Sequence, residues 1–221
     1  DVICSELERG LRLAKPGRPI GAFLLVGPTG TGKTFLSTLI GQALFPNSKP
    51  VVLRMNQYKH ADDVYTLLGP PPGMPGYEVG GALTRPLLEN PYRVVIFDEI
   101  EKSNKDVQHC LYDVLDAGNC REKSSGKLVD FSGTVFFATS NAAVPALRQI
   151  RQNSKDAATW LGQSRDALAD GGGFDKAFLA RWNGIYLRHL VALQTREPLR
   201  QQRPRHVPSG LPFRRGNAVT G

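Results

Sequence analysis

Gly27-Pro28-Thr29-Gly30-Thr31-Gly32-Lys33-Thr34 decides the fold, because it matches the pattern G-x-x-x-x-G-K-[ST]. In this pattern a glycine-rich turn directs backbone N–H groups at an anion, and the helix that follows adds a favourable dipole. Apolar residues at 20–26 predict a buried strand before the turn, and residues 34–44 predict a helix after it. We therefore expect all eight residues to line a nucleotide phosphate site, with an ordinary strand–turn–helix connection as the alternative.

Two acidic residues follow another apolar run. Residues 94–97 read Val-Val-Ile-Phe and predict a buried strand, and Asp98 and Glu99 come directly after it. Open α/β sheets bind ligands beyond the carboxyl ends of their strands, so both carboxylates are expected beside the phosphate loop. We expect Thr34 and Asp98 to hold Mg²⁺ and Lys33 to contact the β- and γ-phosphates. Glu99 would then polarise the attacking water, which favours hydrolysis over phosphoryl transfer. Without the phosphate loop, a strand followed by two acids is more often structural.

A further strand is predicted at 135–138, and the polar residues Thr139, Ser140 and Asn141 follow it. The side chain of Asn141 could orient water near the γ-phosphate. Strands commonly end in turn-forming Ser or Asn, so this signal is informative only through its position after the other two motifs.

The remaining pattern alternates helices with strands. Helical spacing of apolar residues is present in 1–18, a strand is predicted at 51–55, and helices are predicted at 83–88 and 105–115. Residues 69–81 hold five Gly and four Pro and predict a loop, whereas 142–173 predict polar helical pieces. Alternation of this kind predicts an α/β fold, in which a parallel sheet is sandwiched between helices.

Composition limits the function classes. The chain has 221 residues, 41% of them hydrophobic, and a formal net charge of +8. No run of eighteen apolar residues is present, which excludes a transmembrane helix and predicts no membrane partner. Three cysteines are too few for a disulfide framework and suggest a reducing compartment. The first residue is Asp1 and no leader pattern follows, so we expect a piece of a longer chain without a signal peptide.

The positive charge is uneven along the chain. Residues 1–181 hold 21 basic and 19 acidic side chains, whereas residues 182–221 hold seven arginines and one acidic residue. We therefore expect an ATPase-like domain at 1–181 and an Arg/Pro-rich tail at 182–221 that is disordered or replaces another domain. Residues 182–187 could begin a strand. Because the charge lies mainly in the tail, a nucleic-acid partner is not predicted for the domain.

The order of the motifs resembles an AAA+ module, specifically the second ATPase domain of the Clp/ClpB family. The resemblance covers roughly residues 3–181. It lies in the lead-in at 18–21, the phosphate loop, Phe97-Asp-Glu-Ile-Glu-Lys102 and the sensor at 139–141. Residues 68–84 are similar to the pore-loop block of that family, and 174–181 to its arginine-finger segment.

The resemblance implies a homo-hexamer that binds ATP and Mg²⁺ between subunits. Arg181 would act on the γ-phosphate of a neighbouring subunit; without the resemblance it reads as a snorkelling surface arginine. The loop would line a central pore and grip unfolded polypeptide, through residues that the resemblance assigns: Gly73, Met74, Pro75, Gly76 and Tyr77. The family usually has an aromatic residue where this chain has Met74, and the alternative is that Met74 packs against its own domain.

The chain departs from the family in two further places. An acidic residue that the family carries before Met55 is missing, and residues 201–210 lack the pattern of the small helical lid with its sensor arginine. We therefore expect the lid to be missing or degenerate and the adenine-contacting start to be truncated.

The leading hypothesis is a cytoplasmic ATP-dependent unfoldase or disaggregase module that threads polypeptide through a ring. The alternatives are a nucleotide-binding AAA+ fragment or scaffold without productive hydrolysis and, less favoured, an ATPase that remodels nucleic acid. The four histidines are scattered and predict no structural metal. The Ile-Gly-Leu/Phe tripeptide with which the family docks a protease is not found in 142–173, so no protease partner is predicted.

Overall fold

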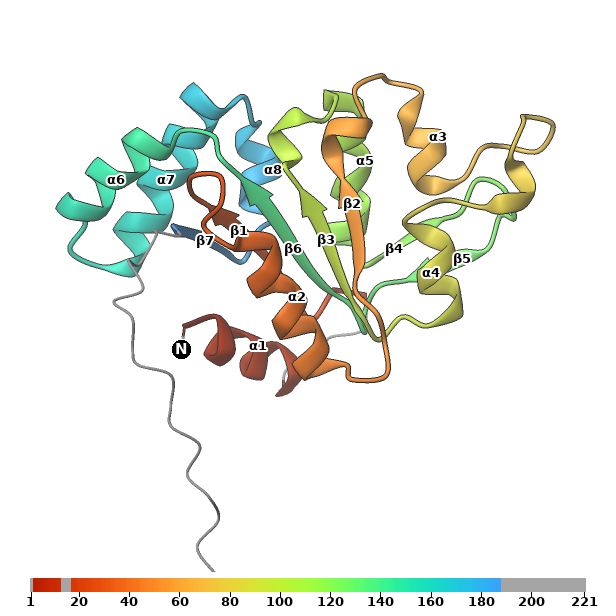
Figure 1. The fold of residues 1–221 in the computed structure, drawn as a ribbon, viewed down its shortest axis with the longest axis horizontal. Helices are drawn as coiled ribbons and strands as arrows, with labels where there is room; N and C mark the ends of the chain where they lie inside the picture. Colours follow the sequence, from red (N-terminus) through yellow and green to blue (C-terminus); the bar gives the residue numbers. More distant parts are fainter. Residues whose placement is uncertain (1, 13–16, 188–221) are drawn as a thin grey trace, which may run out of the picture. The chain divides into compact units, whose positions relative to one another are not determined.

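A five-stranded parallel sheet forms the centre of the computed structural model, which describes residues 2–12 and 17–187 (Figure 1). Its strands lie in the order β2-β3-β6-β1-β7 and confirm the predicted α/β parallel fold. Their bounds are Gly21–Val26 (β1), Val51–Arg54 (β2), Val94–Asp98 (β3), Val135–Ser140 (β6) and Gly184–Leu187 (β7). The predictions for residues 188–221, including the lid, lie outside the described residues.

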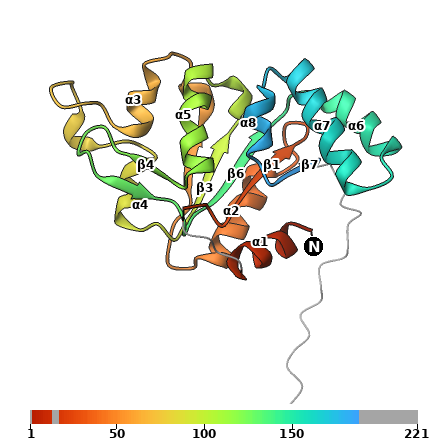
Figure 2. The ribbon, with the colours of Figure 1, turned by 180° about the vertical axis from the view of Figure 1, so that it is seen from behind.

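Helices cover both faces of the sheet, because side chains alternate along each buried strand. On β1, Phe23 and Leu25 belong to one apolar cluster, and Leu24 and Val26 belong to the other. The first cluster packs against α1 (Val2–Arg12) and α2 (Lys33–Leu44), and the second against α5 (Lys105–Asp116), α7 (Ala157–Gly172) and α8 (Lys176–Ala180). Figure 2 shows α5 and α8 on the face opposite to α2.

Several short elements were not predicted from the sequence. Helix α3 (Asp63–Leu68) precedes the loop at 69–81, and that loop contains one 3-10 turn, η2 (Tyr77–Val79). Strands β4 (Asn119–Arg121) and β5 (Leu128–Asp130) pair as an antiparallel hairpin after α5. Two further 3-10 turns are η1 (Met55–Gln57) and η3 (Ile100–Lys102). By contrast, α4 (Thr84–Glu89) lies where a helix is predicted at 83–88, and α6 (Val144–Asn153) and α7 lie where helical pieces are predicted at 142–173.

Strand order places the candidate site. Strand β6 lies between β1 and β3, so the ends of these three parallel strands meet at one edge. The phosphate loop follows β1, Asp98 ends β3, and Asn141 follows β6. None of the helices among the described residues is long and apolar enough to cross a bilayer.

Candidate functional site

The phosphate loop connects β1 to α2 through two glycines with left-handed backbone. Gly30 has φ +80° and Gly32 has φ +74°, and an added Cβ at either position would meet no atom within 4 Å. Glycine is therefore needed here for its backbone conformation rather than for lack of space. Gly32 is also the N-cap of α2 and offers no side-chain cap, so the first N–H groups of this helix remain suited to an anion.

The ammonium group of Lys33 lies on its own loop. Its Nζ donates to the carbonyl oxygens of Gly27 (2.7 Å) and Pro28 (2.9 Å), and the Thr31 hydroxyl also donates to Pro28 O (2.9 Å). Burial lowers the pKa of Lys33, an effect that the nearby carboxylates of Glu101, Asp98 and Glu99 oppose. The loop thus presents a cation among three carboxylates.

Asp98 connects the phosphate loop to β6. Its Oδ1 accepts hydrogen bonds from the hydroxyls of Thr34 (2.5 Å) and Thr139 (2.7 Å). The structure therefore brings together Thr34 and Asp98, the two predicted ligands of Mg²⁺. No cluster of three or more His, Cys, Asp or Glu that could hold a metal exists within the described ranges. A hydroxyl and a single carboxylate fit Mg²⁺, which in nucleotide sites takes its remaining ligands from phosphates and water.

Glu99 occupies an unusual backbone position directly after β3. It has φ +57° and ψ +52°, and its N–H donates to Thr139 Oγ1 (3.0 Å). Its carboxylate pairs with Lys102 Nζ (2.8 Å). Left-handed backbone is costly for a residue with a Cβ and occurs often at active sites. Thr139 thus holds both Asp98 and the backbone of Glu99, a role that sequence reasoning missed; the only signal was its place at the end of a buried strand.

Asn141 lies beside Glu101, an acidic residue to which the sequence alone assigned no role. Its N–H donates to Glu101 Oε1 at 3.5 Å, and the other carboxylate oxygen of Glu101 is buried without a hydrogen-bond partner among the described residues. The spacing Asp98-x-x-Glu101 could have indicated this residue, because the 3-10 turn after Glu99 carries it back toward the strand ends.

A cavity of about 300 Å³ unites these groups. Asn141 and Glu99 line it, and Phe35, whose side chain is largely exposed, lies at its rim. The full lining is Thr29, Gly30, Thr31, Gly32, Lys33, Thr34, Phe35, Asp98, Glu99, Thr139, Ser140 and Asn141. The remaining predicted residues of the phosphate loop, Gly27 and Pro28, do not line the cavity, and their carbonyl oxygens accept hydrogen bonds from Lys33 Nζ.

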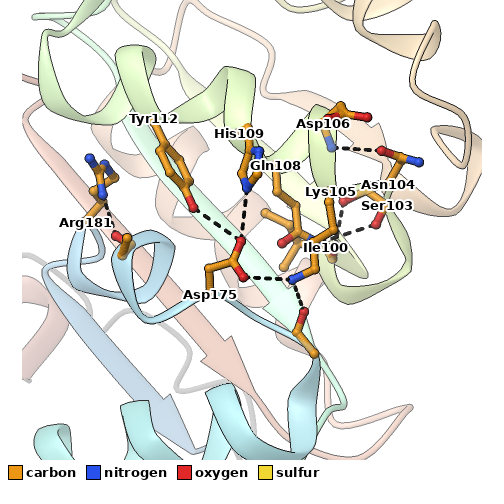
Figure 3. A network of polar contacts seen from close by, with 12 residues as sticks. Ile100, Ser103, Asn104, Lys105, Asp106, Gln108, His109, Tyr112, Asp175 and Arg181 are labelled. Atoms are coloured by element: carbon orange, nitrogen blue, oxygen red, sulfur yellow. Dashed lines mark hydrogen bonds and ion pairs between the residues drawn. The ribbon is translucent and has the colours of Figure 1, made fainter.

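Arg181 does not line this cavity. It is the C-cap of α8, and its guanidinium pairs with Asp116 (2.6 Å) and lies 4.3 Å from the centre of the Tyr112 ring. Figure 3 shows Arg181 beside Tyr112 on α5. The same helix holds the other end of α8, because Asp175 accepts hydrogen bonds from His109 (3.1 Å) and Tyr112 (3.5 Å).

The predicted polypeptide-binding loop projects from the domain between α3 and α4. Met74 is 44% exposed and Tyr77 42% exposed, so neither residue is buried in the domain. Gly73 and Gly76 have positive φ, and an added Cβ at either would meet nothing within 4 Å. Turn hydrogen bonds at Met74 N–H to Pro71 O (3.1 Å) and Tyr77 N–H to Met74 O (3.3 Å) shape this loop.

Comparison with known proteins gives consistent matches. Residues 18–184 match the family described as AAA domain (Cdc48 subfamily). The chain is 39% identical over 180 residues to the chaperone protein ClpB of Rhizobium meliloti, covering 80% of the chain and 20% of the relative. It is 45% identical over 156 residues to ClpB of Helicobacter hepaticus, covering 68% and 18%. It is 36% identical over 188 residues to the ATP-dependent Clp protease ATP-binding subunit ClpE of Lactococcus lactis, covering 84% and 25%. The chain thus spans a quarter or less of the length of these relatives.

Proposed function

The chain belongs to the AAA domain (Cdc48 subfamily) family, as a Clp/ClpB-type AAA+ ATPase domain, and from this premise we propose that it hydrolyses ATP to thread polypeptide through a ring. The observation that carries the proposal is the hydrogen-bonded group around Asp98. Its Oδ1 joins the phosphate loop, through Thr34, to β6, through Thr139, and Thr139 also binds the N–H of Glu99. This arrangement supports the proposal, because it joins the phosphate loop, Asp98 and Glu99 at the ends of three adjacent strands.

The proposed chemistry divides among the residues of the cavity. The N–H groups of the loop and Lys33 bind the phosphates, and Thr34 with Asp98 holds Mg²⁺, which when bound supplies positive charge beside the phosphate oxygens. Glu99 polarises a water molecule and accepts its proton, and the Asn141 amide orients that water. To accept that proton, the Glu99 carboxylate must break its ion pair with Lys102.

The proposal also covers partners, and the names of the matched relatives support it. These relatives are named chaperone protein ClpB and ATP-dependent Clp protease ATP-binding subunit ClpE. We propose a homo-hexamer in which Arg181 acts on a neighbouring subunit, and an unfolded or aggregated polypeptide client bound by residues 73–77. A cytoplasmic location belongs to the same proposal, whereas a membrane, a nucleic acid and a protease partner do not.

The substitution Glu99→Gln tests the catalytic assignment. We expect phosphate release to fall by about 10²- to 10⁴-fold, the usual contribution of a general base. Binding of Mg-ATP, measured as a rise in thermal stability, should persist in Glu99→Gln and be lost in Lys33→Ala. Hydrolysis by Glu99→Gln at the rate of the parent chain would refute the role of Glu99.

A second candidate is a nucleotide-binding scaffold without productive hydrolysis. The pairing of Arg181 with Asp116 and Tyr112 within one chain favours it, because a residue that acts on a neighbour must be free to reach it. Sedimentation of the chain with and without a slowly hydrolysed ATP analogue separates the two candidates. A larger assembly with the analogue supports the ring, and a persistent monomer supports the scaffold.

A further inference from the structure

Glu122, which follows β4, carries a carboxylate that the nucleotide site does not use. The residue is only 4% exposed, and its Oε1 accepts hydrogen bonds from Gly81 N–H (3.2 Å) and from the Thr84 hydroxyl (2.9 Å). Its Oε2 accepts from the Ser125 hydroxyl. None of the described residues forms an ion pair with it, so hydrogen bonds alone compensate its burial.

The electrostatic balance at Glu122 fits an ionised group. Burial raises the pKa of this carboxyl, but hydrogen bonds from Ser125, Thr84, the Gly81 N–H and Ser124 together bring the pKa below its usual value. A charged carboxylate holds N–H and O–H donors more tightly than a neutral acceptor does. The group is therefore suited to fixing backbone in place.

The backbone that Glu122 fixes is the base of the loop at 69–81. An added Cβ on Gly80 would lie 2.8 Å from Glu122 Oε1, and one on Gly69 would lie 2.8 Å from the Ser124 hydroxyl. An added Cβ on Gly81 would lie 2.4 Å from the carbonyl oxygen of Leu67. The two ends of the loop therefore approach each other closely enough to exclude side chains, and the hairpin β4–β5 closes over them.

The far end of the same loop has no such support. Gly73 and Gly76 have open space around them, and Met74, Tyr77 and Val79 expose between 42% and 60% of their surface. The loop thus has a fixed base and a projecting apolar tip. Glu122 lies just after β4, which follows α5, and α5 follows the segment that carries Asp98 and Glu99. The Glu122 carboxylate therefore binds the base of the projecting loop from a segment that α5 joins to Asp98 and Glu99.

We propose that Glu122 is a positioning residue: it sets the direction in which Met74 and Tyr77 are presented to an extended, apolar stretch of unfolded polypeptide and so couples client binding to hydrolysis. This inference rests on the proposed function, because it assumes that the chain hydrolyses ATP and that residues 73–77 bind a client.

The test measures ATP hydrolysis by the full chain with and without a permanently unfolded protein, reduced and carboxymethylated lactalbumin. Glu122→Gln puts an NH₂ donor where only an acceptor fits, so we expect stimulation by the client to fall at least about fivefold, with the basal rate and the KM for ATP within about twofold of the parent. Glu8→Gln is the matched control, since Glu8 is an exposed carboxylate on α1 that belongs neither to the loop nor to the lining of the cavity, and it should keep full stimulation.

A second pair of variants covers the case in which Glu122→Gln does not fold. Thr84→Val removes one hydroxyl donor to Glu122 and should weaken stimulation, whereas Thr84→Ser keeps that hydroxyl and should restore it. A folding defect alone would lower basal and stimulated hydrolysis together. Full stimulation of either folded variant, Glu122→Gln or Thr84→Val, would overturn the role of Glu122 while leaving the proposed function intact. A parent chain that hydrolyses no ATP, or that the client does not stimulate, would instead refute the proposed function and this inference with it.

Discussion

At the scale of single residues, hydroxyl groups hold the candidate site together. Asp98 is positioned by Thr34 and Thr139, and Thr139 in turn accepts the N–H of Glu99. Sequence patterns identify the carboxylates, because acids after a buried strand are conspicuous. They do not identify Thr139, since a threonine at a strand end is common and its role depends on which strand lies beside it.

Thr139→Val should separate hydrolysis from binding. It removes one donor to Asp98 and the acceptor of the Glu99 N–H, and a hydrogen bond to a charged group contributes about 1.5–3 kcal/mol. We expect hydrolysis to fall about 10- to 100-fold, with a smaller change in ATP affinity, measured by phosphate release and calorimetry. Thr38→Val is the control, because the Thr38 hydroxyl donates only to the carbonyl of Thr34 on its own helix. An equal loss in both variants would contradict the role of Thr139.

The lowered pKa of Glu122 predicts how stability depends on pH. A carboxyl whose pKa is lower in the folded chain than in the unfolded chain stabilises the fold above the unfolded pKa. That contribution is lost as the pH falls through the folded pKa. Urea unfolding across this acidic range should therefore show the parent losing its stability advantage over Glu122→Gln. A difference in the free energy of unfolding between the parent and Glu122→Gln that does not change with pH would contradict this prediction.

At the scale of elements, helix α5 fixes both ends of the short helix α8. Lys105, His109, Tyr112 and Asp116 recur at intervals of three or four residues and so share one face of α5. Lys105, His109 and Tyr112 bind Asp175, the N-cap of α8 (Figure 3). Asp116 binds Arg181, the C-cap of α8. The resemblance predicted a role for Arg181, but this support from α5 depends on tertiary packing and was not visible in the sequence.

Sequence reasoning predicted long buried elements better than short ones. Strands β1, β3 and β6 each contain a continuous apolar run, and every residue of β1 and β6 is buried, so periodicity and composition sufficed. Strand β2 ends one residue before the predicted bound, because Met55 begins a 3-10 turn. Strand β5 buries only Val129, and its partner β4 has no apolar pattern, so backbone pairing and the contacts of Glu122 define this hairpin.

The base of the projecting loop should tolerate no added methyl group. Gly81→Ala would place a Cβ 2.4 Å from Leu67 O and 2.5 Å from Gly69 N, and the free energy of unfolding in urea should fall by at least about 2 kcal/mol. Gly162→Ala makes the same change within α7, where nothing lies within 4 Å, and should add about 0.5–1 kcal/mol through helix propensity. Equal effects of the two changes would show that the close approach at Gly81 carries no energetic weight.

At the scale of the whole molecule, no arginine is among the described residues that line the cavity. In the proposed hexamer, Arg181 of another copy of the chain would supply the positive charge that stabilises the γ-phosphate. The ion pair of Arg181 with Asp116 is half exposed on the Asp116 side, so another carboxylate or phosphate can compete for the guanidinium.

Mixing two inactive variants tests this arrangement. Arg181→Ala keeps an intact cavity, and Lys33→Ala keeps the arginine; each alone should hydrolyse ATP at least about 10³-fold more slowly than the parent. An equimolar mixture should recover a measurable part of the parent rate, because each variant supplies what the other lacks. A mixture as inactive as its components would contradict action between subunits.

Strand order also decides when this protein can mature during synthesis. The phosphate loop is made before β6 and β7, and β1 pairs on one side with β6, from Val135 onward, and on the other with β7, from Gly184 onward. A nascent chain that has not yet reached Val135 therefore holds β1 without a neighbour on either side, and contacts so distant in sequence form slowly. The phosphate loop therefore leaves the ribosome before the sheet that positions it is complete, and a chain whose translation stops between the two carries the complete nucleotide motif without that sheet.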